Sequence, residues 1–328
     1  MECDLSVIIP LYNSSYSIKR CLDSVTNQSL VPKTIIVVND GSTDDSEAII
    51  KSLNIAGIIY LTQENKGQAT ARNLGLNRVN TKYIAFLDSD DYWEAGFTET
   101  CIGFLEKNET IDVVNTAQNV KEFGHQLRVN PEITNTVTQP VILDDFFGFW
   151  AEHDHIMTGS VVFKTELYNN VGKQLDNLRI SQDLEYWAML AFQGTWAFIP
   201  KPLFTTDGMA NAVSMGWKKK YSKRRKLCPT VEEWETRLKS RINNSNLESY
   251  KKIRGKVALN FVNSMILSKR DKDAFKTIKK YSNEFPKGKL SKLLEYSTGY
   301  GWITRFFVFS AIRFREQYYY FKLNKQIV

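Results

Sequence analysis

The sequence predicts an α/β protein whose core is a doubly wound, mostly parallel sheet flanked by helices. Three observations support this fold class. Short, nearly continuous runs of branched apolar residues recur in the N-terminal part of the chain, segments with the apolar spacing of a helix separate them, and polar or acidic residues directly follow several of the runs. Such runs are typical of strands covered on both faces, and strands that alternate with helices favour a parallel sheet.

The predicted elements alternate along the chain. Strands are expected over residues 5–10, 34–39, 57–61, 83–87 and 111–114, and helices over the segment with Ile18, Leu22 and Val25, over about 68–79 and over about 94–105. Ser42 and Asp45 have the spacing of a capping box, which predicts another helix after the second strand. Because ligands bind at the carboxyl ends of the strands in such sheets, the residues after the strands form the candidate site.

Three carboxylates, those of Asp88, Asp90 and Asp91, follow the fourth predicted strand. Like charges this close raise one another's pKa unless a cation or strong donors lie among them. Carboxylate oxygens are the ligands that Mg²⁺ or Mn²⁺ prefers, usually together with phosphate oxygens of a substrate. The stretch therefore predicts a metal site, and the alternative is an acidic turn at the start of the next helix.

Charged residues also follow the second and third predicted strands. Asp40 lies before the flexible Gly41, where its carboxylate is able to accept hydrogen bonds from a base or a ribose. Lys66 and Arg72 lie on a loop and a helix start, and taken alone they are more typical of a solvated helix start than of a site. No Gly-x-Gly-x-x-Gly pattern follows the first strand and no P-loop pattern occurs, which argues against a dinucleotide site or a P-loop.

The composition is that of an ordinary globular chain, with 328 residues, 43% hydrophobic and 24% charged. No membrane span and no signal peptide is evident, so we expect a cytoplasmic location. The four cysteines (Cys3, Cys21, Cys101 and Cys228) lack the spacing of metal ligands, and we expect small buried residues without disulfides.

Charge divides the chain into two parts. Residues 218–328 carry 28 Lys and Arg against 9 Asp and Glu, a net charge of +19, whereas residues 1–217 carry 15 against 27, a net charge of −12. We therefore expect a first domain over 1–217 and a basic, mainly helical region over 218–328. Such a basic region favours an anionic partner, which is a membrane surface, a phosphorylated substrate or nucleic acid, and the alternative is a solvated helical face.

Four motifs together resemble family 2 glycosyltransferases of the GT-A fold, which are inverting enzymes. They are Ser6–Asn13, Val38–Asp44, Asn65–Asn73 and Phe86–Asp91, and the resemblance covers roughly residues 4–215. It implies a nucleotide-diphosphate sugar, most often a UDP-sugar, as donor. The implied roles are a nucleoside pocket lined by Pro10, Tyr12 and Asp40, phosphate and carboxylate contacts from Lys66 and Arg72, donor contacts from Asp88 and Ser89, and a Mn²⁺ or Mg²⁺ ligand in Asp90.

A second centre is expected at Gln182-Asp183, in the first turn of a predicted helix. There the positive helix end keeps a carboxylate ionised, and the resemblance implies that Asp183 is the catalytic base. The family usually has Glu at the position of Gln182, and Glu185 is the alternative base. Relatives place a metal-ligating histidine after the last strand, where this chain offers Asp207. His153 and His155 are expected in a loop that borders the site, because two histidines without a further partner are weak evidence for a metal.

Two segments of the basic region invite membrane interpretations. Residues 217–226 would cover the diphosphate as a lid or lie against lipid headgroups, and residues 301–322 interleave aromatic and basic side chains, as interfacial helices do. The alternative for 301–322 is packing on the preceding helices, where Val257, Phe261, Val262 and Met265 form an apolar stripe.

The sequence as a whole predicts an inverting, metal-dependent glycosyltransferase on the inner face of a bacterial membrane, with a glycan or lipid-linked acceptor. A nucleic-acid- or membrane-binding protein with a non-catalytic donor domain is the alternative. No nucleic-acid motif favours it, so no nucleic-acid partner is expected.

Overall fold

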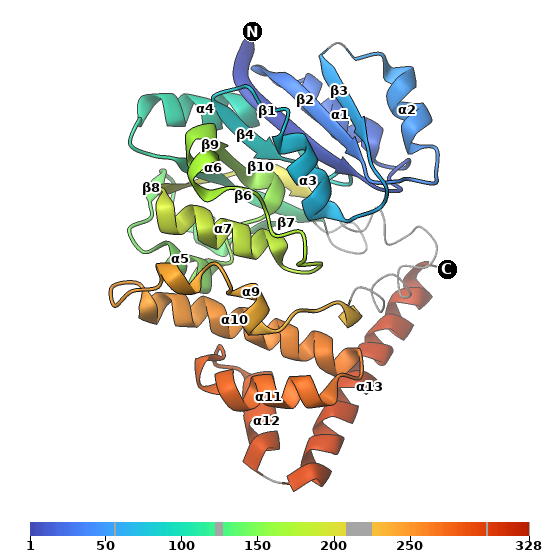
Figure 1. Ribbon diagram of the computed structural model, residues 1–328, viewed down its shortest axis with the longest axis vertical. Helices are drawn as coiled ribbons and strands as arrows, with labels where there is room; N and C mark the ends of the chain where they lie inside the picture. The colour runs from blue at the N-terminus through green and yellow to red at the C-terminus, as the bar shows by residue number, and fades with distance from the viewer. Residues whose placement is uncertain (56, 122–126, 208–224, 300, 328) are drawn as a thin grey trace. The chain divides into compact units, whose positions relative to one another are not determined.

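The computed structural model describes residues 1–328 except 56, 122–126, 208–224, 300 and 328 (Figure 1). Contacts divide the chain into two compact units. The sheet unit comprises residues 1–177 and 182–217, and the helical unit comprises residues 178–181 and 218–328. The short segment Leu178–Ser181 therefore groups with the C-terminal region, although its chain neighbours on both sides belong to the sheet unit.

One mixed sheet forms the centre of the sheet unit. Its order is β3-β2-β1-β4-β9-β6-β10-β5, with β7 beside β6 and β8 beside β10. The strands are β1 (Glu2–Leu11), β2 (Val31–Asn39), β3 (Ile58–Thr62), β4 (Tyr83–Phe86), β5 (Tyr92–Trp93), β6 (Val113–Lys121), β7 (Leu127–Asn130), β8 (Val141–Ile142), β9 (Val161–Lys164) and β10 (Trp196–Thr206). The predicted α/β class and the strands at residues 5–10, 34–39 and 83–87 are confirmed.

One strand, β9, runs against its neighbours in the middle of the sheet. Pairings among β3, β2, β1 and β4 are parallel, and so is the pairing of β6 with β10, whereas β9 runs antiparallel between β4 and β6. The register pairs Lys164, at the end of β9, with Tyr83, at the start of β4. The chain thus crosses from the carboxyl edge back to the amino edge without a helical crossover, which makes the sheet less parallel than predicted.

Helices cover both faces of the sheet (Figure 1). They are α1 (Ile18–Thr26), α2 (Ser46–Leu53), α3 (Gln68–Leu76), α4 (Phe97–Lys107), α5 (Phe146–His153), α6 (Thr165–Val171) and α7 (Gln182–Gln193), with short 3₁₀ turns at Glu132–Asn135 and Thr158–Ser160. Side chains alternate across each strand. The core on one face joins the odd-numbered residues of β1 from Cys3 to Leu11 to the apolar sides of α1 and α4.

The other face packs against α3 and α7. A Cβ atom added at Gly75 of α3 would lie 2.6 Å from Cγ2 of Ile8, so the helix reaches β1 this closely only with glycine there. Phe86 of β4 packs against Tyr186 and Trp187 of α7, with tilted rings whose centroids lie 6.1 and 6.2 Å from that of Phe86. Both helices that carry predicted site residues are therefore seated on the same face, beside β1 and β4.

The helical unit consists of α9 (Val231–Trp234), α10 (Leu247–Leu267), α11 (Asp271–Tyr281), α12 (Lys289–Gly299) and α13 (Gly301–Ile327), with 3₁₀ turns at Lys239–Arg241 and Ser282–Glu284. The predicted stripe of Val257, Phe261, Val262 and Met265 is buried, and all four cysteines of the chain are buried and free, as expected. Within this unit the indole nitrogen of Trp234 donates to the carbonyl oxygen of Ser181 at 3.1 Å.

Candidate active site

The loops after β1 and β2 are locked together at the carboxyl edge of the sheet. Asn13 accepts a hydrogen bond from the backbone nitrogen of Thr43 at 2.7 Å, and its own nitrogen donates to Oγ of Ser42 at 3.0 Å. Ser15 N donates to a carboxylate oxygen of Asp44 at 2.9 Å. The capping-box prediction for Ser42 and Asp45 is wrong: α2 begins without a side-chain cap, because Ser42 is engaged by the β1 loop instead.

Asp40 is 4% exposed and holds the loop that leads into α3. One of its carboxylate oxygens accepts hydrogen bonds from Gln63 Nε2 at 2.6 Å and Lys66 N at 2.8 Å, and the other accepts from Gly67 N at 2.9 Å. The backbone nitrogens of Lys66 and Gly67 both donate to this carboxylate, so position 40 needs a side chain with two acceptor oxygens. Of the other residues predicted for a nucleoside pocket, Pro10 is buried in β1 and Tyr12 is 38% exposed at its end.

Arg72 is fully engulfed at the centre of the site, with 1% of its surface exposed, so the solvated-helix alternative is wrong for it. Its Nη2 donates to Oδ1 of Asp88 at 2.6 Å, and its guanidinium lies 5.5 Å from the ring centroid of Phe86. Asp88 Oδ1 also accepts from Nε2 of Gln68 at 2.8 Å. The Nε and Nη1 atoms of Arg72 have no hydrogen-bond partner among the described residues, so two cationic N–H groups remain to be satisfied.

The other residues of the acidic stretch have distinct surroundings. The Ser89 hydroxyl lies 2.8 Å from the hydroxyl of Ser14, which ties this turn to the β1 loop. Asp91 is 7% exposed and accepts a hydrogen bond from Asp207 N at 2.8 Å. Burial, and then the charges of Asp90 and Asp88, raise the pKa of the Asp91 carboxyl well above its usual range. Asp90 is half-buried, at the turn between these groups.

Arg20 of α1 is a site residue that the sequence reasoning missed. Its Nη2 donates to the backbone oxygen of Asp90 at 2.7 Å, its Nη1 contacts Oδ2 of Asp207 at 2.7 Å, and its guanidinium lies 4.6 Å from the ring centroid of Tyr92. Lys121 Nζ lies 3.1 Å from the same Asp207 oxygen. The sequence offers one weak signal for Arg20. Its helical spacing places it off the apolar face formed by Ile18, Leu22 and Val25, where a side chain is able to reach other residues.

Asp207 was predicted as a further metal ligand, yet here its carboxylate is neutralised by two cations. It is 3% exposed, and both contacts above fall on one of its oxygens. Most of the predicted loop 206–214 and of the basic segment 217–226 lies outside the described residues. The described residues contain no group of three or more His, Cys, Asp or Glu side chains able to hold a metal.

The start of α7 is linked to Asp88 through the side chain of Gln68. Gln182 is 3% exposed, and its Nε2 donates to Oε1 of Gln68 at 3.3 Å, while Gln68 donates to Asp88. Asp183 follows in the first turn and is half-buried, whereas Glu185 is completely buried. A carboxylate that takes a proton from a substrate has to be reached by it, so Asp183 is the better placed of the two candidate bases.

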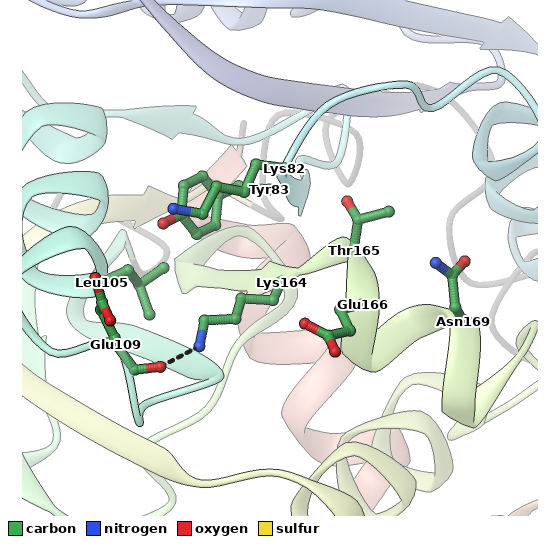
Figure 2. Close-up of a pocket in the computed structure, with 8 residues that line it drawn as sticks. All are labelled: Lys82, Tyr83, Leu105, Glu109, Lys164, Thr165, Glu166 and Asn169. Atoms are coloured by element: carbon green, nitrogen blue, oxygen red, sulfur yellow. Dashed lines mark hydrogen bonds between the residues drawn. The ribbon is translucent and has the colours of Figure 1, made fainter.

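Two other regions lie apart from this arrangement. His155 is buried against the rings of Phe146, Phe149 and Phe198, and His153 ends α5. A cavity of about 400 Å³ opens at the amino end of β4, and Figure 2 shows its lining residues Lys82, Tyr83, Leu105, Glu109, Lys164, Thr165, Glu166 and Asn169. Its lysines are ion-paired with Glu106 and Asp112, and the opposite end of β4 carries the acidic stretch.

Two comparisons of the sequence with known proteins agree. Residues 6–165 match the family model described as glycosyl transferase family 2. Over 98 residues the chain is 44% identical to the glycosyltransferase GlyA of Streptococcus pneumoniae, which covers 29% of this chain and 14% of that protein. Over 215 residues it is 31% identical to the minor teichoic acid biosynthesis protein GgaA of Bacillus subtilis, which covers 54% of this chain and 48% of that protein.

The fold has solved counterparts as well. A crystal structure of Staphylococcus aureus TarS in complex with UDP-GlcNAc matches with a TM-score of 0.61 at 18% identity, over 95% of this chain and 91% of that chain. The sheet unit thus has the GT-A fold. The matched segment 6–165 contains β1 to β4 and the loops that hold Asp40, Arg72 and Asp88, and through this segment the chain belongs to glycosyl transferase family 2.

Proposed function

We propose that this protein is an inverting, metal-dependent glycosyltransferase that moves a sugar from a UDP-sugar to a hydroxyl group of a glycan or lipid-linked acceptor. The observation that carries the proposal is the buried Arg72–Asp88 pair, whose guanidinium retains two unpartnered N–H groups at the carboxyl edge of the sheet. An unsatisfied buried cation at this edge favours an anionic ligand, and a nucleotide diphosphate supplies one.

The family membership and the relatives narrow the substrates. One structural counterpart was solved with UDP-GlcNAc and another with UDP, which supports a UDP-sugar donor. Relatives include a minor teichoic acid biosynthesis protein and the chondroitin synthase of Pasteurella multocida. The chain spans less than half the length of each of these two relatives, and we infer from their names a role in bacterial surface-polysaccharide synthesis.

The carboxylates of the site fit one divalent cation that is shared with the donor. Asp88 is engaged by Arg72 and Gln68, Asp91 by a backbone donor, and Asp207 by two cations. The family resemblance assigns the metal to Asp90, which is half-buried in the turn between these carboxylates and would hold Mn²⁺ or Mg²⁺ together with diphosphate oxygens. When bound, the metal would neutralise charge that grows on the departing diphosphate.

The chain's own residues account for the remaining chemistry. Asp183 takes the proton of the acceptor hydroxyl as its oxygen bonds to the anomeric carbon, and the bond from that carbon to the diphosphate breaks on the opposite face. Arg72 and Lys66 supply positive charge on the diphosphate side. Asp183 is half-buried in the first turn of α7.

The first test separates transfer from donor binding. Replacing Asp183 with Asn should reduce transfer by at least about 1,000-fold and leave the affinity for the UDP-sugar within about 2-fold, because the base acts on the acceptor. Asp23→Asn, on the exposed side of α1, is the matched control and should retain full activity. Full transfer by Asp183→Asn would refute the assignment of the base.

The second test addresses donor and metal together. A panel of nucleotide sugars is scored by thermal shift with and without Mn²⁺, because a ligand that binds only the native state raises its stability. A UDP-sugar should stabilise the protein in a metal-dependent way, and Asp90→Asn should abolish the metal dependence. A panel in which no UDP-sugar responds to Mn²⁺ would contradict the proposal.

We also propose that α13 of the helical unit lies on an anionic membrane surface, where a lipid-linked acceptor is found. The helix is apolar on two sides. Val308, Phe309 and Ile312 are buried, whereas Trp302, Ile303, Phe306, Phe307 and Phe314 are between 55% and 71% exposed. Arg305 stacks on Phe275 and Arg313 pairs with Asp271, so the buried side is already held within the unit.

The exposed side of α13 has the chemistry of an interfacial helix. Aromatic side chains suit the headgroup boundary, and the net charge of +19 over residues 218–328 attracts anionic lipid. No helix among the described residues is long and apolar enough to cross a bilayer. The exposed aromatic side chains and the basic charge favour a helix that lies on the membrane surface.

Binding to vesicles tests this arrangement. The protein should bind vesicles of phosphatidylglycerol and phosphatidylcholine more tightly than vesicles of phosphatidylcholine alone, and a Phe306→Ser, Phe307→Ser double variant should bind at least about 10-fold more weakly. Tyr16→Ser, which removes a 76% exposed aromatic residue from the sheet unit, is the control. Equal binding by all three proteins, or retention on RNA instead of vesicles, would contradict it.

A further inference from the structure

Gln68, the first residue of α3, uses both ends of its side-chain amide. Its Nε2 donates to Oδ1 of Asp88 at 2.8 Å, and its Oε1 accepts from Nε2 of Gln182 at 3.3 Å. Asp88 also accepts from the buried Arg72. A continuous chain of hydrogen bonds thus leads from Arg72 through Asp88 and Gln68 to the first residue of α7.

Gln182 is buried at the end of this series of hydrogen bonds. It is 3% exposed, and its Oε1 has no hydrogen-bond partner among the described residues, so the bond to Gln68 is the one that its amide makes within the described chain. When the single hydrogen-bond partner of a buried polar group is removed, the group is left without a hydrogen bond, which costs free energy. The next residue along α7 is Asp183, the proposed base.

The direction of the hydrogen bonds requires a donor at position 182. The oxygen of Gln68 faces Gln182 and is an acceptor, so residue 182 has to donate. A carboxylate has no hydrogen to donate, and two acceptor oxygens would then face each other. To donate to a carboxylate at position 182, Gln68 would have to rotate its side-chain amide by half a turn. The amide oxygen of Gln68 would then face the carboxylate of Asp88, and both are acceptors.

We propose that Gln68 and Gln182 are a pair of positioning residues that set Asp183 against the donor-side carboxylate Asp88. Through its hydrogen bonds, the pair fixes the position of the first turn of α7 relative to Asp88 and α3. The inference rests on the proposed function, because it assigns the base role to Asp183. It goes further in naming two neutral side chains, neither of which has to touch the reacting atoms, as determinants of turnover.

Single and double variants test the pair. Gln182→Leu and Gln68→Leu should each lower kcat by about 10- to 100-fold, because a misplaced catalytic group loses rate steeply with small displacements. The affinity for the UDP-sugar should change by less than about 3-fold in Gln182→Leu. The double variant should lose no more than the worse single variant, since both changes remove the same connection. Gln193→Leu, at the far end of α7, is the matched control.

A charged variant guards against a trivial loss of folding. Gln182→Glu keeps the size and polarity of the side chain but cannot donate to Gln68, so it should show the same loss of kcat when it is assayed well below its melting temperature. Wild-type kcat in Gln182→Glu and Gln182→Leu, or additive losses in the double variant, would overturn the proposal. If Asp183→Asn retains transfer, the proposed base fails instead, whatever the glutamine variants show.

Discussion

Each unit of the molecule contains arginines that are ion-paired with carboxylates, and the two sets of arginines differ in how many of their nitrogens have a partner. In the helical unit, Arg254 donates Nε and Nη2 to the two carboxylate oxygens of Glu284 at 2.8 and 2.6 Å, and Nη1 to Glu235 at 3.3 Å. In the sheet unit, Arg20 and Arg72 each keep buried nitrogens without a partner among the described residues.

The difference indicates what each cluster is for. The Arg254 cluster is closed, because every nitrogen of the guanidinium meets a carboxylate, and removing one member would leave charges buried. In the sheet unit, Arg20 and Arg72 contact Asp90 and Asp88, which follow the carboxyl end of β4, where we place the donor. An incomplete set of hydrogen bonds around a buried cation is costly unless a ligand completes it. We therefore expect the helical-unit arginine to govern stability and the sheet-unit arginines to govern activity.

The largest effect is expected for Arg72→Met. The substitution removes the partner of Asp88 and the two N–H groups that we assign to the diphosphate, and transfer should fall by about 1,000-fold. Steady-state kinetics with the UDP-sugar identified by thermal shift measures it. Arg254→Met, assayed below its melting temperature, should keep transfer within about 3-fold. A loss of less than 10-fold in Arg72→Met would remove the contrast between the units.

Arg254→Met should have the next largest effect, on stability rather than on transfer. It leaves Glu235, which is 3% exposed, and Glu284 without their main cation, which costs about 3 kcal/mol in the free energy of unfolding. Chemical denaturation measures it. Adding Glu284→Met should recover part of the loss, because one of the unpaired charges is removed with it. A stability equal to that of the wild type would show that the cluster is dispensable.

Arg20→Met should lower transfer less than Arg72→Met and stability less than Arg254→Met. Asp207 keeps Lys121 as a partner, so stability should fall by about 2 kcal/mol. The carbonyl of Asp90 loses its donor, and we expect the Mn²⁺-dependent thermal shift to weaken and transfer to fall by about 30-fold. Arg78→Met, on an exposed position just after α3, is the control. If the Mn²⁺-dependent thermal shift is unchanged in Arg20→Met, Arg20 acts on stability alone, as we expect of Arg254.

The smallest effect is expected for Asp44, a carboxylate of the sheet unit that accepts hydrogen bonds from Ser15 and Ser46. Burial raises its pKa, but hydrogen bonds from Ser46 and Ser15 outweigh it, and the pKa lies below its ordinary value. A lowered pKa stabilises the fold above the unfolded-state pKa of about 3.9, and the contribution is lost as the pH falls through the folded-state value.

Asp44→Asn should accordingly lower the free energy of unfolding by about 1 kcal/mol at pH 7. The difference from the wild type should shrink below about pH 4, as the wild-type carboxylate is protonated. Denaturation at several pH values measures it, and the exposed neighbour Asp45→Asn should show neither change. A loss that is independent of pH would mean that Asp44 acts through its size and not through its charge.

Local patterns in the sequence were sufficient for the elements and for the edge that carries the site. Continuous apolar runs predicted β1, β2 and β4, and the spacing of Ile18, Leu22 and Val25 predicted α1, because strand and helix periodicities are written into neighbouring residues. Parallel strands bring their carboxyl ends to one edge. For this reason Asp40 and Asp88 were expected together before any contact was known.

What the sequence by itself determined is therefore the α/β class, the alternation of strands and helices in the first half of the chain, and the edge at which Asp40, Asp88 and Asp90 follow their strands. The tertiary structure decided the partners: Arg20 meets Asp207 from 187 positions away, Gln68 meets Gln182 from 114 away, and β9 runs against its neighbours. The physical reason is that a hydrogen bond depends on which loops meet in space. Periodicity fixes which face a side chain occupies but not what approaches that face from a distant part of the chain.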